Sequence, residues 1–349
     1  MNPYTEQPAR PRRPRRRSSW SPYMMLAALT LVVASCGGDD DALRVYSGRH
    51  YGIERAFEQF TADTGIEVDF LTGNDAELRE RIAAEGDETK ADAYITVDAG
   101  NLAAAAEQGL FQPIDSAVLD AAIPAELSDP DGRWYALTIR ARTIVYNPDR
   151  IDVGDVPSTY EQLADPEWKG RLCMRNATNV YQQSLVASLI EHHGDDGALE
   201  IVRGWADNAD IMANDTLILE AVDDGICDVG VTNHYYLARE YDENPDFGVE
   251  LLWADQDGRG VHVNVSGGGV TTYSEHPEEA QAFLEWLATD GQEVLIGGNH
   301  EFPANPDVPP DEVLVERFGV DVVRDALQPS VFGALNPEAV ELMDEAGYG

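Results

Sequence analysis

Three short fragments of this chain carry phenol and imidazole side chains at points where a strand should give way to a helix. The fragments are Arg49-His50-Tyr51, Asn179-Val180-Tyr181 and Asn233-His234-Tyr235-Tyr236. A free phenol titrates near pH ~10, so it becomes a good ligand at neutral pH only when a strongly cationic partner draws off its proton. A small, highly charged metal ion such as Fe(III) meets that demand.

Each fragment occupies the same kind of place in the predicted α/β pattern. Strands are predicted at 43–46, 171–174 and 228–231, followed by helices at 53–63, 181–192 and 235–241. In open α/β sheets, ligands bind beyond the carboxyl ends of the strands, where the next helix begins. Thr178, Asn179 and Asn233 suit helix N-caps, and a helix N-terminus lowers the cost of forming a phenolate. A single tyrosine at such a place is more often a half-buried packing residue, so the argument depends on the coincidence of all three fragments.

The rest of the chain continues the alternation of strands and helices. Further strands are predicted at 65–70, 93–97 and 143–146, and further helices at 75–85, 99–108 and 278–289. This alternation predicts an α/β fold with largely parallel sheets, and the length predicts two lobes. The run Gly267-Gly268-Gly269 suits either a hinge crossing between lobes or a bulge or tight turn within one lobe.

The N-terminus has the pattern of an export signal. Six arginines between positions 10 and 17 precede an apolar run at 24–34, which is too short to span a bilayer comfortably. Small residues then lead to Cys36, so residues 1–35 are predicted to be a signal peptide. This junction resembles the lipobox of bacterial lipoproteins, which implies cleavage before Cys36, a diacylglycerol anchor on its sulfur and a tether over 36–42. The alternative is a plain signal peptide with an incidental cysteine.

The chain is strongly acidic. Removing residues 1–35 takes away six arginines and one glutamate, which leaves 18 basic and 63 acidic residues and a formal net charge of −45. Nucleic acid and anionic membrane surfaces would repel such a protein, so neither is expected as a partner. The charge favours the approach of cations, but solvation in a salty habitat explains it equally well.

Two cysteines remain after Cys36. Cys173 lies eight residues before Tyr181, and Cys227 lies eight residues before Tyr235. Two cysteines in an exported chain suggest a disulfide, which on the chain-entropy estimate would add roughly 4 kcal/mol of stability. Such a bridge would tie together the strands that deliver the two tyrosines. Two buried free thiols are the alternative.

The chain resembles the ferric-iron-binding proteins of bacterial ABC transporters in blocks that run in family order over nearly the whole mature length. The blocks are residues 45–51, 96–100, 109–113, 140–147, 164–171, 181–185 and 233–236. The resemblance implies the type II periplasmic-binding-protein fold, in which two α/β lobes are joined by hinge strands and close on Fe(III) in the cleft. The expected N-terminal lobe covers 43–142 and 267–317, and the C-terminal lobe covers 143–266 and 318–349.

The resemblance also implies a ligand set. The subgroup that uses one histidine and four tyrosines would place its ligands at His50, Tyr51, Tyr181, Tyr235 and Tyr236. The first two come from one lobe and the other three from the second, so metal binding would draw the lobes together. Arg140, or else Arg142, matches the arginine that in some members faces a synergistic anion such as carbonate. An ordinary hinge salt bridge is the alternative for this arginine.

Other polar residues receive different interpretations. His234 departs from the family pattern, where a small hydroxyl residue is more common, and is expected to be either a base behind the ligands or an exposed side chain. Tyr94 and Tyr146 lie in apolar strand-like runs and are predicted to be core residues. His192 and His193 end a helix and are predicted to cap it.

The sequence therefore predicts a monomeric solute-binding lipoprotein that captures Fe(III), bare or chelated, and delivers it to an ABC permease in the membrane. It would sit on the outer face of the cell membrane, held by the lipid on Cys36, or in the periplasm. One alternative keeps the fold and binds an organic solute such as a phosphonate, a polyamine, thiamine or a sugar phosphate. A secreted α/β hydrolase is a third hypothesis, but no phosphate loop, His-Glu-x-x-His or nucleophile elbow supports an enzyme.

Overall fold

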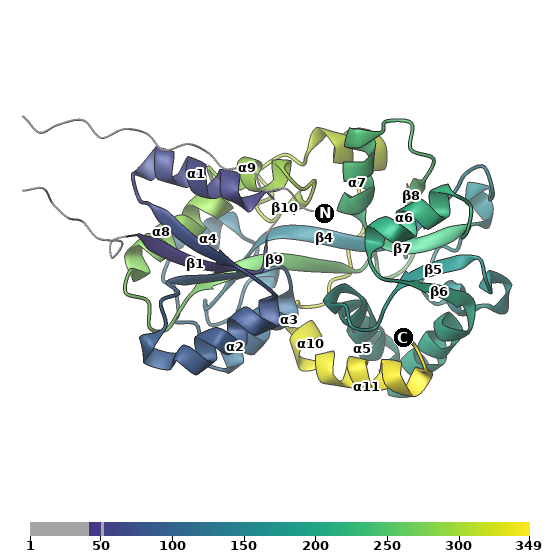
Figure 1. Ribbon diagram of the computed structural model, residues 1–349, viewed down its shortest axis with the longest axis horizontal. Helices are drawn as coiled ribbons and strands as arrows, with labels where there is room; N and C mark the ends of the chain where they lie inside the picture. The colour runs from purple at the N-terminus through teal and green to yellow at the C-terminus, as the bar shows by residue number, and fades with distance from the viewer. Residues whose placement is uncertain (1–41, 50–51) are drawn as a thin grey trace, which may run out of the picture. The chain divides into compact units, whose positions relative to one another are not determined.

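The computed structural model describes residues 42–49 and 52–349 of the chain (Figure 1). Within these residues, the search for long, apolar helices able to cross a membrane found no candidate. The predictions for the export signal and for three single residues fall outside the described part: Cys36, His50 and Tyr51.

The first sheet is built from the N-terminal strands and is covered by helices. Its strand order is β2-β1-β3-β9-β4, with β1 parallel to both β2 and β3. The elements are β1 (Leu43–Ser47), α1 (Ile53–Thr64), β2 (Val68–Thr72), α2 (Asp75–Glu85), β3 (Ala93–Thr96), α3 (Ala99–Glu107) and α4 (Ala117–Ala122). Asn74 and Asp98 cap α2 and α3 by accepting backbone hydrogen bonds, which explains why these helices begin where they do.

The second sheet has the order β4-β7-β5-β6, with β5 parallel to β6 and β7. Its elements are β5 (Leu172–Arg175), α5 (Val180–Asn208), β6 (Ala209–Met212), α6 (Asp215–Asp223), β7 (Val229–Asn233), α7 (His234–Glu243) and β8 (Glu250–Leu252). Gly194 interrupts α5 with φ 69°, so its first helical part ends at His193, close to the predicted boundary.

Two long strands run from one sheet toward the other and appear at the centre of Figure 1: β4 (Tyr135–Tyr146) and β9 (Val263–Val270). Residues 135–141 of β4 pair with β9 in the first sheet, and residues 142–146 pair with β7 in the second. Every antiparallel pairing among the described strands involves β4 or β9. The expectation of largely parallel sheets is therefore corrected, because the strands that cross between the lobes run against the parallel ones.

The C-terminal part of the chain, from residue 277 onward, contacts strands of the first sheet and helices beside both sheets. Its elements are α8 (Pro277–Ala288), α9 (Gln292–Gly297), β10 (Phe302–Pro303), α10 (Ser330–Ala334) and α11 (Asn336–Ala346). In Figure 1 these last two helices, in yellow, lie beside α3 and α5, which they contact. Gly333 of α10 meets Gly100 of α3, and a Cβ on Gly333 would lie 2.9 Å from the Gly100 carbonyl oxygen, so this helix crossing requires glycine.

The glycine run of β9 does not form a hinge. Gly267 and Gly268 pair with β3 on one side and β4 on the other, inside the first sheet. A Cβ on Gly267 would lie 2.5 Å from the Tyr135 carbonyl oxygen, and one on Gly269 would lie 2.4 Å from the Arg133 carbonyl oxygen. The glycines therefore allow a close approach of backbones, near a register shift in β4, and the hinge interpretation of this run is wrong.

Cys173 of β5 and Cys227, just before β7, form a disulfide with their Cα atoms 5.8 Å apart. Both are fully buried in a small hydrophobic cluster together with Val145 and Ile218. The bridge fastens together the two strands that lead into α5 and α7. The predictions for Tyr94 and Tyr146 are also confirmed, since both are buried.

Candidate metal centre

Tyr181 stands in the first turn of α5, directly beyond the end of β5. The Asn179 side chain accepts a hydrogen bond from the Tyr181 backbone N–H at 3.0 Å, which starts the helix at this point and confirms the predicted cap. The Tyr181 side chain is 9% exposed. The local sequence thus places one phenol, nearly buried, at a helix N-terminus.

Tyr235 and Tyr236 stand in the first turn of α7, beyond the end of β7. Asn233 holds the N-cap position without capping through its side chain; instead its amide donates to the Tyr235 hydroxyl at 3.4 Å. The two tyrosine rings stack with centroids 4.5 Å apart, and the Arg239 guanidinium lies over both, 5.0 Å from Tyr235 and 4.6 Å from Tyr236. Tyr235 is 1% exposed and Tyr236 is half-buried, so both phenols are held in place by packing.

The three phenols form one cluster, since Tyr181 and Tyr236 line the same cleft and the Tyr235 ring stacks on that of Tyr236. Burial raises the pKa of Tyr181, and the Arg140 charge and a hydrogen bond with Tyr235 only partly offset this. Burial also raises the pKa of Tyr235 well above its usual range, and negative charge on Tyr181 or Tyr236 would raise it further. At neutral pH Tyr181 and Tyr235 are therefore neutral unless a cation of high charge enters the site.

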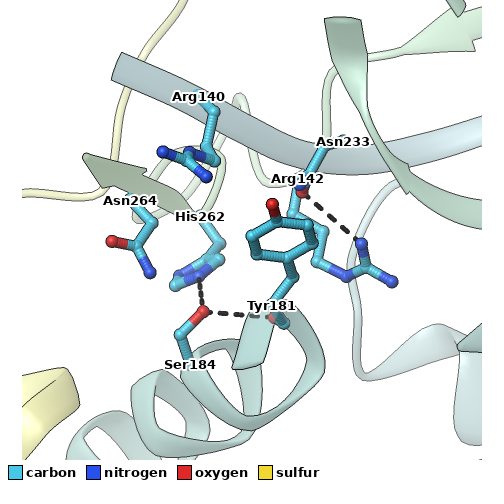
Figure 2. Close-up of a pocket in the computed structure, with 7 residues that line it drawn as sticks. All are labelled: Arg140, Arg142, Tyr181, Ser184, Asn233, His262 and Asn264. Atoms are coloured by element: carbon cyan, nitrogen blue, oxygen red, sulfur yellow. Dashed lines mark hydrogen bonds between the residues drawn. The ribbon is translucent and has the colours of Figure 1, made fainter. Parts of the chain in front are cut away.

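Arg140 faces this cluster from the crossing strand β4. Its guanidinium carbon lies 5.4 Å from the centre of the Tyr181 ring, and one of its terminal nitrogens donates to the Ser266 hydroxyl. Figure 2 shows Arg140 and Tyr181 around one narrow interior space, with Asn264 beside them. The Arg140 Nε is buried and has no hydrogen-bond partner among the described residues.

Arg142, the second arginine considered for the anion, already forms an ion pair and hydrogen bonds with other residues. Its guanidinium donates to Asp215 at 2.7 Å, to Gln182 at 3.3 Å and to the Val231 carbonyl oxygen at 3.1 Å. Asp215 is fully buried and also pairs with Arg175. Arg142 therefore organises the second sheet, which leaves Arg140 as the arginine better placed to meet an anion.

No pattern in the sequence indicated a buried acidic group beside Arg140. Glu301 is 2% exposed and forms an ion pair with Arg49, and Thr138 donates to it at 2.5 Å. Burial alone would raise the pKa of Glu301, but the Arg49 and Arg140 charges outweigh it and lower the pKa to about 2. The Glu301 charge also keeps Arg140 charged, since it offsets the burial that would otherwise lower the pKa of Arg140.

Arg175 and Asp215 are two further residues that the sequence reasoning missed. Arg175 ends β5, and its guanidinium lies 5.6 Å from the Tyr181 ring centre. Burial would lower the pKa of Arg175, but the Asp215 charge and, to a smaller extent, Tyr236 raise it, so Arg175 belongs to the same cluster. Its position at the carboxyl end of a strand, six residues before Tyr181, was the available signal. Asp215 follows a helix cap, as many exposed residues do, and carried no such signal.

His234 is neither an exposed side chain nor a group that faces the cleft. It is fully buried, its Nδ1 accepts from the Ala141 N–H at 3.1 Å, and its Nε2 lies 3.0 Å from the His300 carbonyl oxygen. Burial lowers its pKa to about 4, so it is neutral at pH 7. The expectation of an exposed imidazole is wrong, because both ring nitrogens are taken up by backbone groups.

A cleft of about 690 Å³ opens beside the tyrosine cluster. Its lining comes from both sheets and includes Asp75 and Arg79 of α2, Arg175, Tyr181 and Tyr236.

Groups of three or more His, Cys, Asp or Glu side chains suited to a metal are absent from the described part of the chain. His192 and His193 instead lie 2.7 Å from Asp325 and 2.8 Å from Glu161, in separate pairs.

Comparison with known proteins agrees with this architecture. The family model described as bacterial extracellular solute-binding protein matches residues 88–319. The chain is 38% identical to iron uptake protein A1 of Synechocystis sp. over 90% of each chain, and 30% identical to an Fe(3+)-binding periplasmic protein of Serratia marcescens over 95% of this chain and 98% of the relative.

Solved structures give the same result. A Trichodesmium protein, IdiA (FutA), in complex with iron and citrate ligands superposes with a TM-score of 0.83 at 40% identity and covers 88% of this chain and 100% of its own. The ferric binding protein from Campylobacter jejuni gives a TM-score of 0.82 at 33% identity, with the same coverage. The mixed α/β fold is thus the two-lobe type II periplasmic-binding-protein fold. The chain belongs to the bacterial extracellular solute-binding proteins, in the group that contains these iron-uptake and ferric-iron-binding relatives.

Proposed function

We propose that this protein captures Fe(III) in the cleft between its lobes and delivers it to an ABC-type permease. The observation that carries this proposal is the convergence of three phenols, two buried and one half-buried, from the starts of two helices, beside the charged Arg140. The relatives in Synechocystis and Serratia are named for iron uptake and Fe(3+) binding, and this supports the same cargo here. The proposed ligands are His50, Tyr51, Tyr181, Tyr235 and Tyr236.

The residues of this chain would bind the metal by losing protons. Burial keeps Tyr181 and Tyr235 neutral in the free protein, and a trivalent cation would supply the positive charge that their phenolates need. Arg140 would compensate the excess negative charge or hold a small anion such as carbonate, using donors that described residues leave open. The iron and citrate ligands of the Trichodesmium relative are consistent with an anion beside the metal.

The remaining parts of the proposal concern location and partners. The lipobox-like Cys36 would anchor the exported monomer to the outer face of the membrane, where metal-driven closure of the lobes would present it to the permease. The protein would carry out no covalent chemistry. Its net charge of −45 without residues 1–35 argues against nucleic acid as a partner.

A visible absorption titration of the purified protein with ferric citrate tests this function. Phenolate-to-Fe(III) charge transfer should produce a broad visible band that saturates at one equivalent of iron. Repeating the titration with and without bicarbonate tests the anion at Arg140, which should raise the apparent affinity. A colourless protein whose thermal unfolding is unchanged by iron would refute the assignment, and the cleft would then be screened against small organic solutes.

Iron affinity should fall as the pH is lowered. The pKa values of Tyr181 and Tyr235 are raised, so each proton is still on the phenol at pH 8 and must leave when the metal binds. Each phenol that ionises on binding contributes up to about tenfold in apparent affinity per pH unit, with lower affinity at lower pH. Competition titrations between pH 8 and 6, corrected for the ionisation of the competing chelator, should show this slope together with proton release in unbuffered solution. An affinity independent of pH would exclude the phenols as ligands.

A further inference from the structure

A second cavity lies on the reverse face of the crossing strands and is here called the rear pocket. Its volume is about 610 Å³, within the usual range of roughly 300–1,000 Å³ for small-ligand sites. Ile139 of β4 and Val263 of β9 line it, whereas their neighbours Arg140 and Asn264 line the space beside Tyr181. Because successive side chains on a strand point to opposite faces, the rear pocket lies behind the tyrosine cluster, across the same two strands.

The walls of the rear pocket are largely apolar and rigid. Leu127 and Val308 contribute aliphatic side chains, and four prolines complete the walls: Pro124, Pro303, Pro306 and Pro310. Proline rings fix the backbone, so this surface exists before a ligand arrives and little ordering is needed on binding. An apolar group of a few carbon atoms fits such a site.

One cation faces this apolar pocket, and no acidic side chain in the described part of the chain forms an ion pair with it. Arg324 is the only basic residue in the lining, and its guanidinium carbon lies 4.8 Å from the centre of the Phe302 ring. Arg324 is exposed to solvent overall, but desolvation by the surrounding protein lowers its pKa, and no carboxylate within the described ranges counteracts that effect. Of the two acidic residues in the lining, Asp325 is engaged by His192 at 2.7 Å, and Glu126 is exposed. In a chain with 64 acidic residues, an unpaired arginine at an apolar pocket is an unusual feature that suits an anionic ligand.

The backbone on either side of Arg324 is hydrogen-bonded to the segment that leads into β9. The Val261 N–H donates to the Val323 carbonyl oxygen at 2.9 Å, and the Asp325 N–H donates to the Val261 carbonyl oxygen at 2.9 Å. Gly260, with φ 95°, makes this approach possible, since a Cβ there would lie 2.6 Å from the Arg324 carbonyl carbon. The segment that carries Arg324 is thus fixed to the residues that lead into β9.

Ring contacts link the rear pocket to the tyrosine cluster. The Phe302 ring beneath Arg324 stacks on the His234 ring with centroids 4.8 Å apart. His234 in turn holds the Ala141 N–H of β4, and its ring contacts that of the next residue, Tyr235, with centroids 5.9 Å apart. A ligand that moved the Arg324 side chain would therefore disturb the packing of His234, which directly precedes the proposed iron ligand Tyr235.

We propose that the rear pocket binds a small amphipathic monocarboxylate, with the carboxylate on Arg324 and the apolar tail between the prolines, and that this binding changes the affinity for iron. The coupling to iron rests on the proposed function, but the binding site does not. The coupling follows because the pocket is walled by the strands that join the lobes, so its shape changes when the lobes move.

Calorimetric titration of sodium octanoate into the iron-free protein tests the site. Octanoate should bind one-to-one, and Arg324→Gln and the pocket-filling Val308→Trp should each weaken binding by about tenfold or more. Arg317→Gln is the matched control, because Arg317 also lies over an aromatic ring, 4.6 Å from Tyr241, but outside the pocket. Octylammonium should not bind, since it would face Arg324 with a like charge.

Repeating the iron titration at saturating octanoate tests the coupling. The apparent iron affinity should shift by about threefold or more in the wild type and by less in Arg324→Gln. Failure of octanoate to bind, or equal binding by Arg324→Gln, would overturn the site. An unchanged iron affinity would overturn the coupling. Absence of any iron band would count against the proposed function, while the octanoate result on iron-free protein would still stand.

Discussion

Tyr235→Phe should weaken Fe(III) binding by roughly a hundredfold or more and should shift or remove the visible band. The substitution deletes only a hydroxyl, at a residue that is 1% exposed, so the ring can stay stacked on Tyr236 at the start of α7. The hydroxyl accepts a long hydrogen bond of 3.4 Å from the Asn233 amide and shares another with Tyr181, so the cost to stability should be within about 2 kcal/mol. The effect is therefore expected on the metal and not on the fold.

Tyr241→Phe is the matched control for this experiment. It lies on the same helix α7, and its hydroxyl donates to the Val249 carbonyl oxygen at 2.5 Å, away from the cluster. It should lose some stability and bind iron normally. If Tyr235→Phe binds iron as tightly as Tyr241→Phe does, with the same spectrum, then Tyr235 is not a ligand and the proposed centre would have to be rebuilt from other residues.

Local patterns were sufficient to predict the elements that deliver the tyrosines. The helix predicted at 75–85 coincides with α2, and the strands and helices around Tyr181 and Tyr235 lie within a few residues of their predicted bounds. These segments are predictable because their own caps and apolar spacing determine them. The likeness to iron-binding proteins was also visible in short blocks of sequence, and four of them stand at strand–helix junctions and contribute residues to the lining of the cleft: 45–51, 96–100, 181–185 and 233–236.

Long-range charge pairing explains what the sequence did not reveal. Only 143–146 was predicted as a strand, whereas β4 runs from Tyr135 to Tyr146. Its missed half contains Arg140 and Arg142, which break the apolar pattern although both are 1% exposed. Their burial is possible because Glu301 and Asp215, which are distant in sequence, neutralise them. No local pattern can supply that information.

Glu301→Gln should destabilise the folded protein by about 3–5 kcal/mol at pH 7, although it changes neither size nor shape. Removing the charge would leave Arg49 and Arg140, each 1% exposed, as buried cations without their carboxylate. The lowered pKa of Glu301 agrees with this magnitude: a fall from 4.5 to about 2 on folding corresponds to about 3–4 kcal/mol, at ~1.4 kcal/mol per unit. Urea unfolding is the appropriate measurement, since urea does not screen charges. Glu275→Gln, which removes an exposed partner of Lys90, is the control and should cost under about 1 kcal/mol.

The pH dependence of this difference separates loss of charge from loss of packing. Because the pKa of Glu301 is lowered on folding, its contribution is complete above the unfolded value near 4.5 and disappears as the pH falls toward about 2. The gap in stability between wild type and Glu301→Gln should therefore be constant from pH 7 to about 5 and should close between about 4.5 and 2. A gap that persisted at the acidic end would mean that the glutamine disturbs packing. A gap absent at pH 7 would mean that the two buried arginines do not depend on Glu301, and the electrostatic account of how Arg140 keeps its charge beside the tyrosines would fail.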